Sequence, residues 1–154
     1  MSLETKTLPA MRFAAVRHSG PYNEIGPAFH TLGQIAGKAA LFEKPGALMI
    51  GIYKDDPGTT SPQDLRSAAV IVIAEDTVIP EGLVEERVPG GRFACFMHKG
   101  SYATLKDSWM RVKTELMPTS GYRRRPGPAY EIYINNPAQV AQDELRTEIC
   151  VPIS

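Results

Sequence analysis

The feature that most constrains the fold of this chain is an internal repeat. Residues 9–73 align with residues 89–153 at a constant offset of 80 positions and without a gap, and 13 of the 65 aligned positions are identical. The identities gather in short segments, as where PAMRFAAVRHSGPY lies over PGGRFACFMHKGSY. Such a repeat predicts two copies of one supersecondary unit, each too small to bury an apolar face well by itself. We therefore expect residues 1–154 to form a single domain built from two similar halves.

Each half contains the same series of expected elements. An apolar strand comes first and ends at a polar turn. A helix follows, because apolar residues recur at steps of four, three and four in both halves. Two further strands flank a turn with the sequence DDPG or NNPA. The expected ranges are strands at 12–18, 47–53 and 66–74 with a helix near 25–36, and strands at 92–98, 129–134 and 146–153 with a helix at 105–116 that stops at Pro118.

This repeated β-α-β-β order predicts an α+β fold with a mostly antiparallel sheet and two helices. Two units related by a pseudo-twofold axis can pool their strands and bury more apolar surface. We expect a ligand cleft between the halves, because clefts at the junction of units are where ligands usually bind. The acidic segment from Glu75 to Val88 is expected to link the halves and to lead into the second one.

The composition argues against several classes of function. Seventeen basic residues balance seventeen acidic ones, so no global charge favours nucleic acid or a membrane surface. No apolar run approaches the length of a membrane span and no signal peptide is visible, which predicts a cytoplasmic protein. Cys95 and Cys150 lie in apolar segments and are expected to be buried thiols that form neither a disulfide nor a metal site. No cofactor or metal motif is present, so neither is expected.

The positions where the two halves differ indicate a binding site. Glu131 stands in an aromatic and aliphatic strand, where a carboxylate is costly to bury without a partner. Its counterpart is Gly51, which leaves space where the other half carries an acid. Side chains alternate along a strand, so Tyr133 shares the face of Glu131, and Tyr53 shares the face of Gly51. Two tyrosines, a gap and a carboxylate are therefore expected to line one concavity.

The helix stripe also differs between the halves. Trp109, the only tryptophan, stands where the first half has Phe29. An indole is the best aromatic face for a cation, with a contact worth about 0.5–2 kcal/mol. The expected ligand-binding residues are therefore Glu131, Trp109, Tyr133, Tyr53, Gly51 and Phe29.

Structural roles remain open for the same positions. The glutamate can instead be a rim residue or a structural acid paired with Arg66 or Arg146. The tryptophan can be ordinary core, and both tyrosines suit a strand without any ligand. His18 and His98 recur just before the turn into each helix, and this symmetry favours a role in the turn over one in catalysis.

Several segments, in this order and spacing, resemble a known family. They are HSGPY after RFAAVR, IGIYKDDP, GRFACFMHKGSY and YEIYINNP. From about Leu8 to Ile153 they resemble the GyrI-like small-molecule-binding family of bacteria, which includes gyrase-inhibitor-type proteins and the effector-binding domains of AraC-type and MerR-type transcription regulators. The resemblance implies a tandem β-α-β-β pair that binds small, often cationic or amphipathic compounds between its halves. In that family a glutamate of the second half's middle strand faces the ligand, and Glu131 occupies that place.

The leading functional hypothesis is thus a module that binds cationic, amphipathic compounds, either to sequester drugs or to sense an effector for a regulator. Its partners would be a small molecule and either a DNA-binding regulator segment or DNA gyrase. No helix-turn-helix is visible, so no nucleic-acid contact is expected through this domain. One alternative is a protein inhibitor of DNA gyrase.

A further alternative is a hydrolase of cyclopropane-type toxic compounds, because some stand-alone members of the family are such hydrolases. Glu131 would then be the general base, with Tyr133 or Tyr53 orienting the substrate or donating a proton to it. The same residues serve binding and hydrolysis, so the sequence does not separate them.

Overall fold

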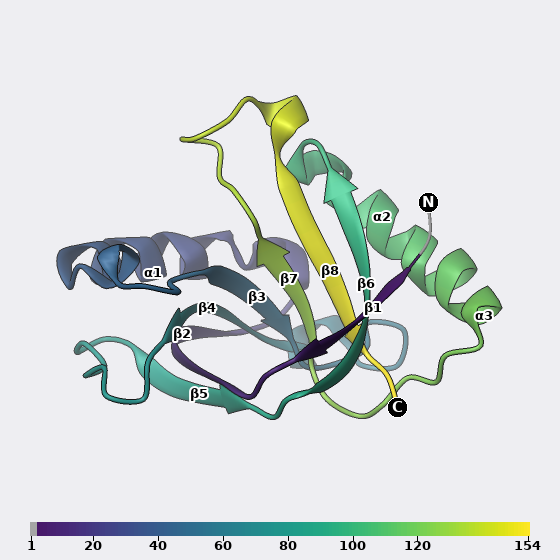
Figure 1. The fold of residues 1–154 in the computed structure, drawn as a ribbon, viewed down its shortest axis with the longest axis horizontal. Helices are drawn as coiled ribbons and strands as arrows, with labels where there is room; N and C mark the ends of the chain where they lie inside the picture. Colours follow the sequence, from purple (N-terminus) through teal and green to yellow (C-terminus); the bar gives the residue numbers. More distant parts are fainter. Residues whose placement is uncertain (1–2) are drawn as a thin grey trace. The chain divides into compact units, whose positions relative to one another are not determined.

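The structure is a computed structural model that describes residues 3–154 (Figure 1). The strands are β1 (Glu4–Leu8), β2 (Met11–Ser19), β3 (Met49–Tyr53), β4 (Arg66–Ile73), β5 (Val84–Val88), β6 (Gly91–Lys99), β7 (Ala129–Tyr133) and β8 (Arg146–Pro152). The helices are α1 (Gly26–Lys38), α2 (Leu105–Arg111) and α3 (Met117–Ser120), with a π-helical turn at Val112–Leu116 joining the last two. Short 3₁₀ turns lie at Tyr22–Glu24, Leu41–Glu43, Pro62–Asp64, Tyr102–Thr104 and Gln142–Glu144.

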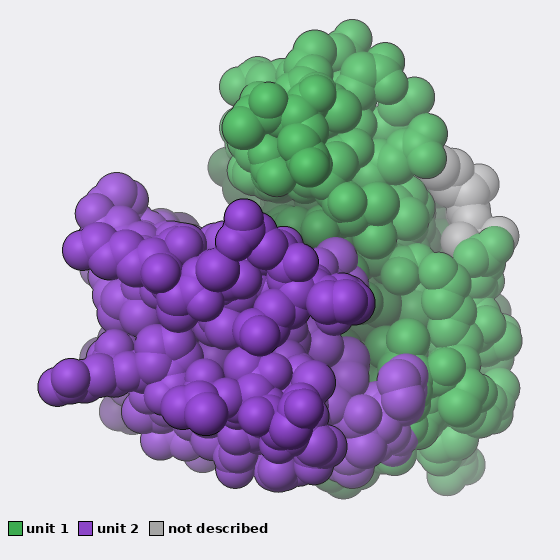
Figure 2. All heavy atoms as spheres, turned by 60° about the vertical axis from the view of Figure 1, so that its left-hand side comes forward, with its two compact units in different colours: residues 1–8, 91–154 green, residues 9–90 purple. Residues whose placement is uncertain are grey.

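The chain divides into two compact units, coloured in Figure 2. Unit 2 is the continuous segment Pro9–Gly90, and unit 1 combines the segment that ends at Leu8 with Gly91–Ser154. In unit 2 the strands pair in the order β3-β4-β2-β5, and in unit 1 in the order β1-β6-β8-β7. All of these pairs are antiparallel. The α+β class and the order of elements in each half are therefore confirmed, whereas the single domain over residues 1–154 stays a prediction.

Two strands lie outside the predicted β-α-β-β units. Part of the segment expected to be a linker forms β5, which pairs with β2 along Met11–Ala15. Its counterpart at the offset of 80 is β1, which pairs with β6. Each sequence repeat is thus preceded by a short strand that pairs with a strand of the other repeat. The segment expected to link the halves therefore contains a strand, Val84–Val88, that the sequence did not predict. As an edge strand it pairs with one neighbour only and satisfies half of its backbone groups in that way.

The second helix extends further than predicted, since helical structure continues past Pro118 to Ser120. The π-helical turn before it resets the hydrogen-bond ladder, so Pro118 falls in the first turn of α3, where its missing N–H needs no helical partner. Gly121, with φ of 81°, then ends the helix in a left-handed conformation. In α1, Pro27 likewise lies in the first turn.

In each unit, helical residues cover one face of the four paired strands. In unit 2, Leu32 and Ala36 of α1 pack with Ala14, Ala69 and Ile71 of β2 and β4. In unit 1, the helical residues Leu105, Trp109, Val112 and Leu116 pack with Phe96, Ile149 and Val151 of β6 and β8. The apolar stripes predicted from the sequence are therefore the faces that the helices bury. No helix within residues 3–154 is long and apolar enough to cross a membrane.

The turn from the first strand into the helix is built the same way in both units. Gly20 and Gly100 have φ of 122° and 119°, and their N–H groups donate to the carbonyls of Leu65 and Leu145. The preceding histidine ring in each case lies within hydrogen-bond distance of a carbonyl three residues on, at 3.0 Å in unit 2 and 2.9 Å in unit 1. The symmetric histidines thus hold turns, as their recurrence indicated.

Candidate functional site

Glu131 lies in the middle of β7, on the face that the helices of unit 1 cover. In the register it stands opposite Ile149 of β8, whose side chain belongs to the core cluster under α2. Only 7% of its surface is exposed. The Trp109 indole Nε1–H donates to Oε2 at 2.5 Å, and the Tyr133 hydroxyl donates to Oε1 at 2.7 Å. One donor comes from the helix and the other from the same strand, so both carboxylate oxygens are held in place.

The two donors that hold the carboxylate are uncharged groups. Because indole N–H and phenol O–H carry no formal charge, these two hydrogen bonds bring no positive charge to Glu131. Burial and the Glu131 carboxylate together raise the pKa of Tyr102. The cluster therefore places a buried carboxylate among aromatic groups.

Tyr102 is a member of the site that the predicted set of residues does not include. Its ring meets the Tyr133 ring edge to face, with the centroids 5.7 Å apart and an interplanar angle of 69°. The Tyr102 side chain remains 39% exposed, so it lies at the solvent side of the cluster. The sequence did hold a signal, because Tyr22 and Tyr102 are identical at the offset of 80. Together Glu131, Trp109, Tyr133 and Tyr102 form what we term the Glu131 cluster.

The other three predicted residues belong to unit 2. Tyr53 ends β3 and meets Tyr22 edge to face, with centroids 4.8 Å apart. Phe29 is half-buried on α1 and packs, like Tyr53, against the helix-side core. Gly51 is buried in β3 opposite Ala69, on that same face. The structure thus brings Trp109, Glu131 and Tyr133 together in unit 1, and groups Phe29, Gly51 and Tyr53 on the equivalent face of unit 2.

Arg66 and the turn after β3 have polar partners of their own. Arg66, one of the arginines considered for Glu131, makes a two-point ion pair with Asp55, at 3.0 and 2.9 Å. This pairing lowers the pKa of Asp55. Asp56 accepts a hydrogen bond from the Gly58 N–H at 2.8 Å, as a turn residue does.

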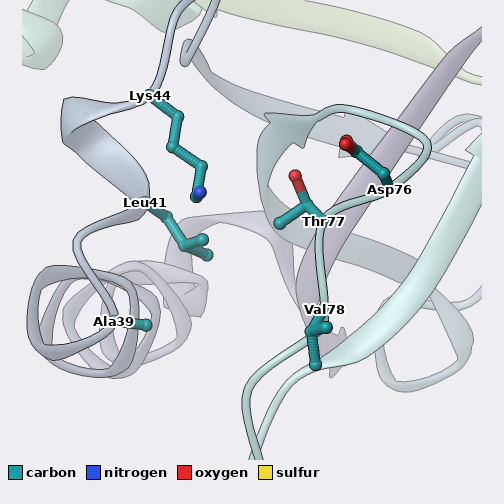
Figure 3. Close-up of a pocket in the computed structure, with 6 residues that line it drawn as sticks. All are labelled: Ala39, Leu41, Lys44, Asp76, Thr77 and Val78. Atoms are coloured by element: carbon teal, nitrogen blue, oxygen red, sulfur yellow. The ribbon is translucent and has the colours of Figure 1, made fainter.

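A separate depression lies in unit 2 (Figure 3). It has a volume of about 320 Å³ and contains none of the residues predicted to bind a ligand. Its lining is mixed, with small apolar side chains, one lysine and one aspartate: Ala39, Leu41, Lys44, Asp76, Thr77 and Val78. It offers no aromatic wall and little enclosure, so the Glu131 cluster is the better candidate for ligand binding.

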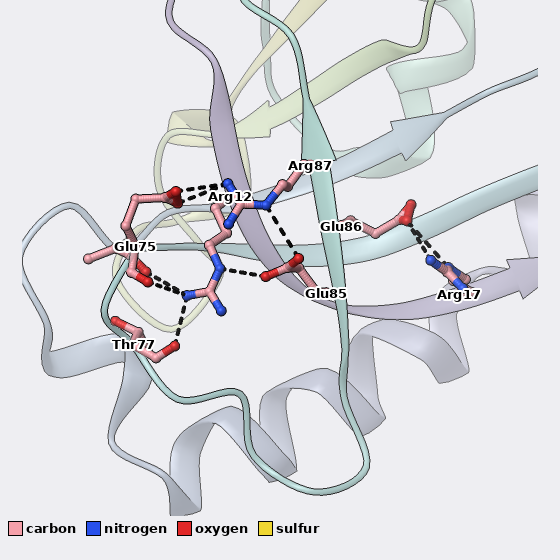
Figure 4. Close-up of polar contacts among 8 residues, drawn as sticks. Arg12, Arg17, Glu75, Thr77, Glu85, Glu86 and Arg87 are labelled. Carbon is pink, nitrogen blue, oxygen red and sulfur yellow. Dashed lines mark hydrogen bonds and ion pairs between the residues drawn. The ribbon is translucent and has the colours of Figure 1, made fainter.

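An ionic network holds the loop beside that depression (Figure 4). Arg12 of β2 donates to the carbonyls of Ala74 and Thr77, each at 2.7 Å, and to Glu85 of β5 at 2.7 Å. Arg87 of β5 pairs with Glu75 at 2.8 Å. These contacts tie the β4–β5 connection to β2 and β5, which is a structural role.

Comparison with known proteins identifies a family for this chain. A family model described as the GyrI-like small molecule binding domain matches residues 1–154. A protein of Yersinia enterocolitica named DNA gyrase inhibitor is 28% identical over 129 residues, which cover 81% of each chain.

Solved structures of two proteins share the fold. The EcmrR C-terminal domain superposes with a TM-score of 0.76 at 17% identity, over 99% of this chain and 97% of its own. In a complex of EcmrR with DNA, this chain covers 57% of the EcmrR chain, with a TM-score of 0.72. SAV2435 bound to tetraphenylphosphonium superposes with a TM-score of 0.76 at 13% identity, over 100% of this chain and 94% of its own. At these identities the likenesses concern the fold.

Proposed function

Because the chain belongs to the GyrI-like small-molecule-binding family, we propose that its Glu131 cluster binds cationic, amphipathic compounds. Glu131 is the counter-ion for the positive charge, and the rings of Trp109, Tyr133 and Tyr102 are the apolar walls. The module acts by sequestering such compounds or by sensing them for a DNA-binding regulator. The observation that carries this proposal is a carboxylate with 7% exposure that an indole and a phenol hold in place.

The chemistry of the cluster favours a cation over a neutral or anionic compound. A positive charge about 5 Å from the carboxylate gains about 3 kcal/mol at an effective dielectric constant of about 20. Each aromatic face that the cation meets adds about 0.5–2 kcal/mol. An anion of the same size would be repelled by a similar amount. The cluster therefore discriminates mainly by charge, while the aromatic rings accept many apolar shapes.

The related proteins support the two parts of this proposal. SAV2435 was solved with tetraphenylphosphonium, a lipophilic cation of the predicted class. EcmrR carries the same fold in its C-terminal domain and has been solved on DNA, which supports a sensing role for this chain beside a DNA-binding segment. Relatives named DNA gyrase inhibitor make gyrase a second candidate partner. A supercoiling assay with purified gyrase tests that second role directly.

The main experiment is a calorimetric titration of the full chain with tetraphenylphosphonium. Glu131→Gln keeps the shape of the side chain and removes its charge, so we expect the affinity to fall about ten- to a hundredfold. Tetraphenylborate, an anion of matching shape, should bind the wild type weakly. Its affinity for the Glu131→Gln variant should be equal or higher. The matched control is Glu86→Gln, which removes a shielded carboxylate of unit 2 that pairs with Lys54 and Arg17.

Two results would contradict the proposal. One is a Glu131→Gln variant that melts like the wild type and binds the cation with unchanged affinity. The other is an equal loss of affinity in the Glu86→Gln control, which would mean that net charge and not the site attracts the cation. Mass spectrometry of the recovered ligand separates binding from hydrolysis, because a hydrolase would return a product and its Glu131→Gln variant would bind without turnover.

A further inference from the structure

The second buried polar cluster of unit 1 contains both cysteines, and we infer that it is a site for a thiophilic divalent metal ion such as Zn²⁺. Cys95, Cys150 and Glu148 each offer one donor atom, and these atoms lie within 4.8 Å of one another. They form the one group of this kind among the residues that the structure describes. The sequence predicted two separate buried thiols, because spacing alone does not reveal which residues stand opposite one another.

The strand register brings the two thiols together. Cys95 of β6 stands directly opposite Cys150 of β8, and the sulfur atoms are 3.2 Å apart. Hydrogen bonds from Ile153 N–H to the Arg92 carbonyl and from Gly100 N–H to the Leu145 carbonyl bracket this ladder. Since hydrogen-bonded and non-hydrogen-bonded pairs alternate, the cysteines form a non-hydrogen-bonded pair, in which side chains approach most closely.

The donor atoms suit a tetrahedral ion after small movements. With metal–sulfur distances of about 2.3 Å, two thiolates of a tetrahedral zinc site lie about 3.8 Å apart, so the sulfur atoms need to separate by about 0.6 Å. Glu148 lies two residues before Cys150 on the same face of β8 and supplies a carboxylate oxygen. Two sulfurs and one oxygen leave the fourth position for water or another small ligand.

The charges of the cluster balance once a divalent ion is bound. Metal binding releases the two thiol protons to solvent and creates two thiolates, which with the Glu148 carboxylate carry three negative charges. The ion supplies two positive charges. Lys6 of β1 supplies the third, with its Nζ 2.5 Å from the Glu148 carboxylate. Neutrality matters here because Cys95 and Cys150 are only 2% and 0% exposed.

The cluster is specific to one of the two repeats. At the offset of 80, the counterparts of Cys95 and Cys150 are Ala15 and Val70, which pair in the same register in unit 2. The counterpart of Glu148 is Ala68. The fold therefore forms without the thiols and the acid, so their presence in unit 1 needs another reason than the sheet itself.

The test uses the untagged full chain, reduced and treated with chelator, and Cd²⁺ as an optical probe for zinc-like thiolate sites. We expect an ultraviolet thiolate-to-metal charge-transfer band that saturates at one ion per chain and is displaced by Zn²⁺. The double variant Cys95→Ala/Cys150→Val copies the pair found in unit 2 and should abolish the band. Glu148→Gln should keep the band and weaken binding about tenfold or more.

Three outcomes overturn the site. The first is a fully reduced wild type that takes up no Cd²⁺. The second is a band that persists in the double variant, which would place the ion on other residues. The third is Glu148→Gln with unchanged affinity.

If the double variant fails to fold, the rate of thiol alkylation in the wild type is the deciding measurement. Zn²⁺ must slow the alkylation of both cysteines, and an unchanged rate refutes the inference. A chain that instead oxidises to an internal disulfide, loses two hydrogens in mass and binds no ion after reduction falls under the first outcome.

Discussion

Arg12 and Arg92 are identical residues at equivalent positions of the two repeats, yet they make different contacts. Arg12 has a side chain with 12% exposure, and it donates to three carbonyls of the β4–β5 connection, two at 2.7 Å and one at 3.3 Å. Arg92 is exposed and donates to a single carbonyl, that of Ser154, at 3.1 Å. Hydrogen bonds from a charged donor contribute about 1.5–3 kcal/mol each. A lysine at position 12 can keep one of the two short carbonyl contacts.

We therefore expect Arg12→Lys to lower the free energy of unfolding by about 2 kcal/mol, whereas Arg92→Lys should cost about 0–1 kcal/mol. The ion pair between Arg12 and Glu85 adds little to this difference, because the Glu85 side chain is 43% exposed and lysine can replace the contact. For a chain of this size about 2 kcal/mol corresponds to a fall in melting temperature of about 4–8 °C.

The melting temperatures of both variants are measured under the same conditions, with circular dichroism as the probe of unfolding. The matched pair keeps the charge of the protein constant, so a difference between the two variants reports the geometry of the guanidinium contacts. Equal losses in Arg12→Lys and Arg92→Lys would refute the reasoning, since the two carbonyl contacts would then contribute nothing beyond what any exposed arginine does. A loss confined to Arg92→Lys would refute it as well.

Two further predictions concern pH. Burial raises the pKa of Glu86, but hydrogen bonds from Lys54 and Arg17 outweigh this effect and leave the pKa lowered. The stability that Glu86 contributes is therefore full above about pH 4.3 and is lost as the pH drops through the folded pKa. Glu86→Gln should flatten this acid loss in urea titrations, and an unchanged acid loss would contradict the prediction. Burial raises the pKa of Tyr130 to about 12, so the stability it contributes is full below about pH 10 and is lost between there and about pH 12. Tyr130→Phe should reduce that alkaline loss of stability. Spectrophotometric titration of the variant should show one tyrosine fewer among those that ionise at the highest pH.

The sequence predicted the elements that bury apolar surface and missed those that do not. Strands β2, β4, β6 and β8 carry continuous apolar runs, and the helix stripes repeat at fixed steps, so burial leaves a pattern in the residues. Strands β1 and β5 are mostly exposed edge strands with the sequences ETKTL and VEERV, and their only strong requirement is backbone pairing. Backbone pairing leaves almost no mark on composition, and these two segments share no identical residue.

The sequence predicted an acid grouped with aromatic residues, and the binding role of these residues stays a prediction. The contrast between Glu131 and Gly51 indicated an acid with a special role, and the indole and phenol bonds to that acid agree with the predicted grouping of Trp109 with Tyr133. Tyr102 was missed because it lies in a turn, outside the strand and helix patterns that located the others. The contact between Cys95 and Cys150 was missed because strand register depends on the whole sheet and not on local spacing.

The exchange of β1 and β5 between the units has a consequence for synthesis on the ribosome. Unit 2 is complete once residue 90 has emerged, but β1 must wait for β6, which follows more than 80 residues later in the chain. At about 5–20 residues per second this leaves an unpaired strand for several seconds. During that time β1 of one nascent chain can meet β6 of another, since both copies offer the same partner. Unit 1 thus depends on β1, a segment that is synthesised long before the rest of that unit. Pairing of β1 with β6 of a neighbouring chain gives an intertwined dimer, and the order of translation allows it.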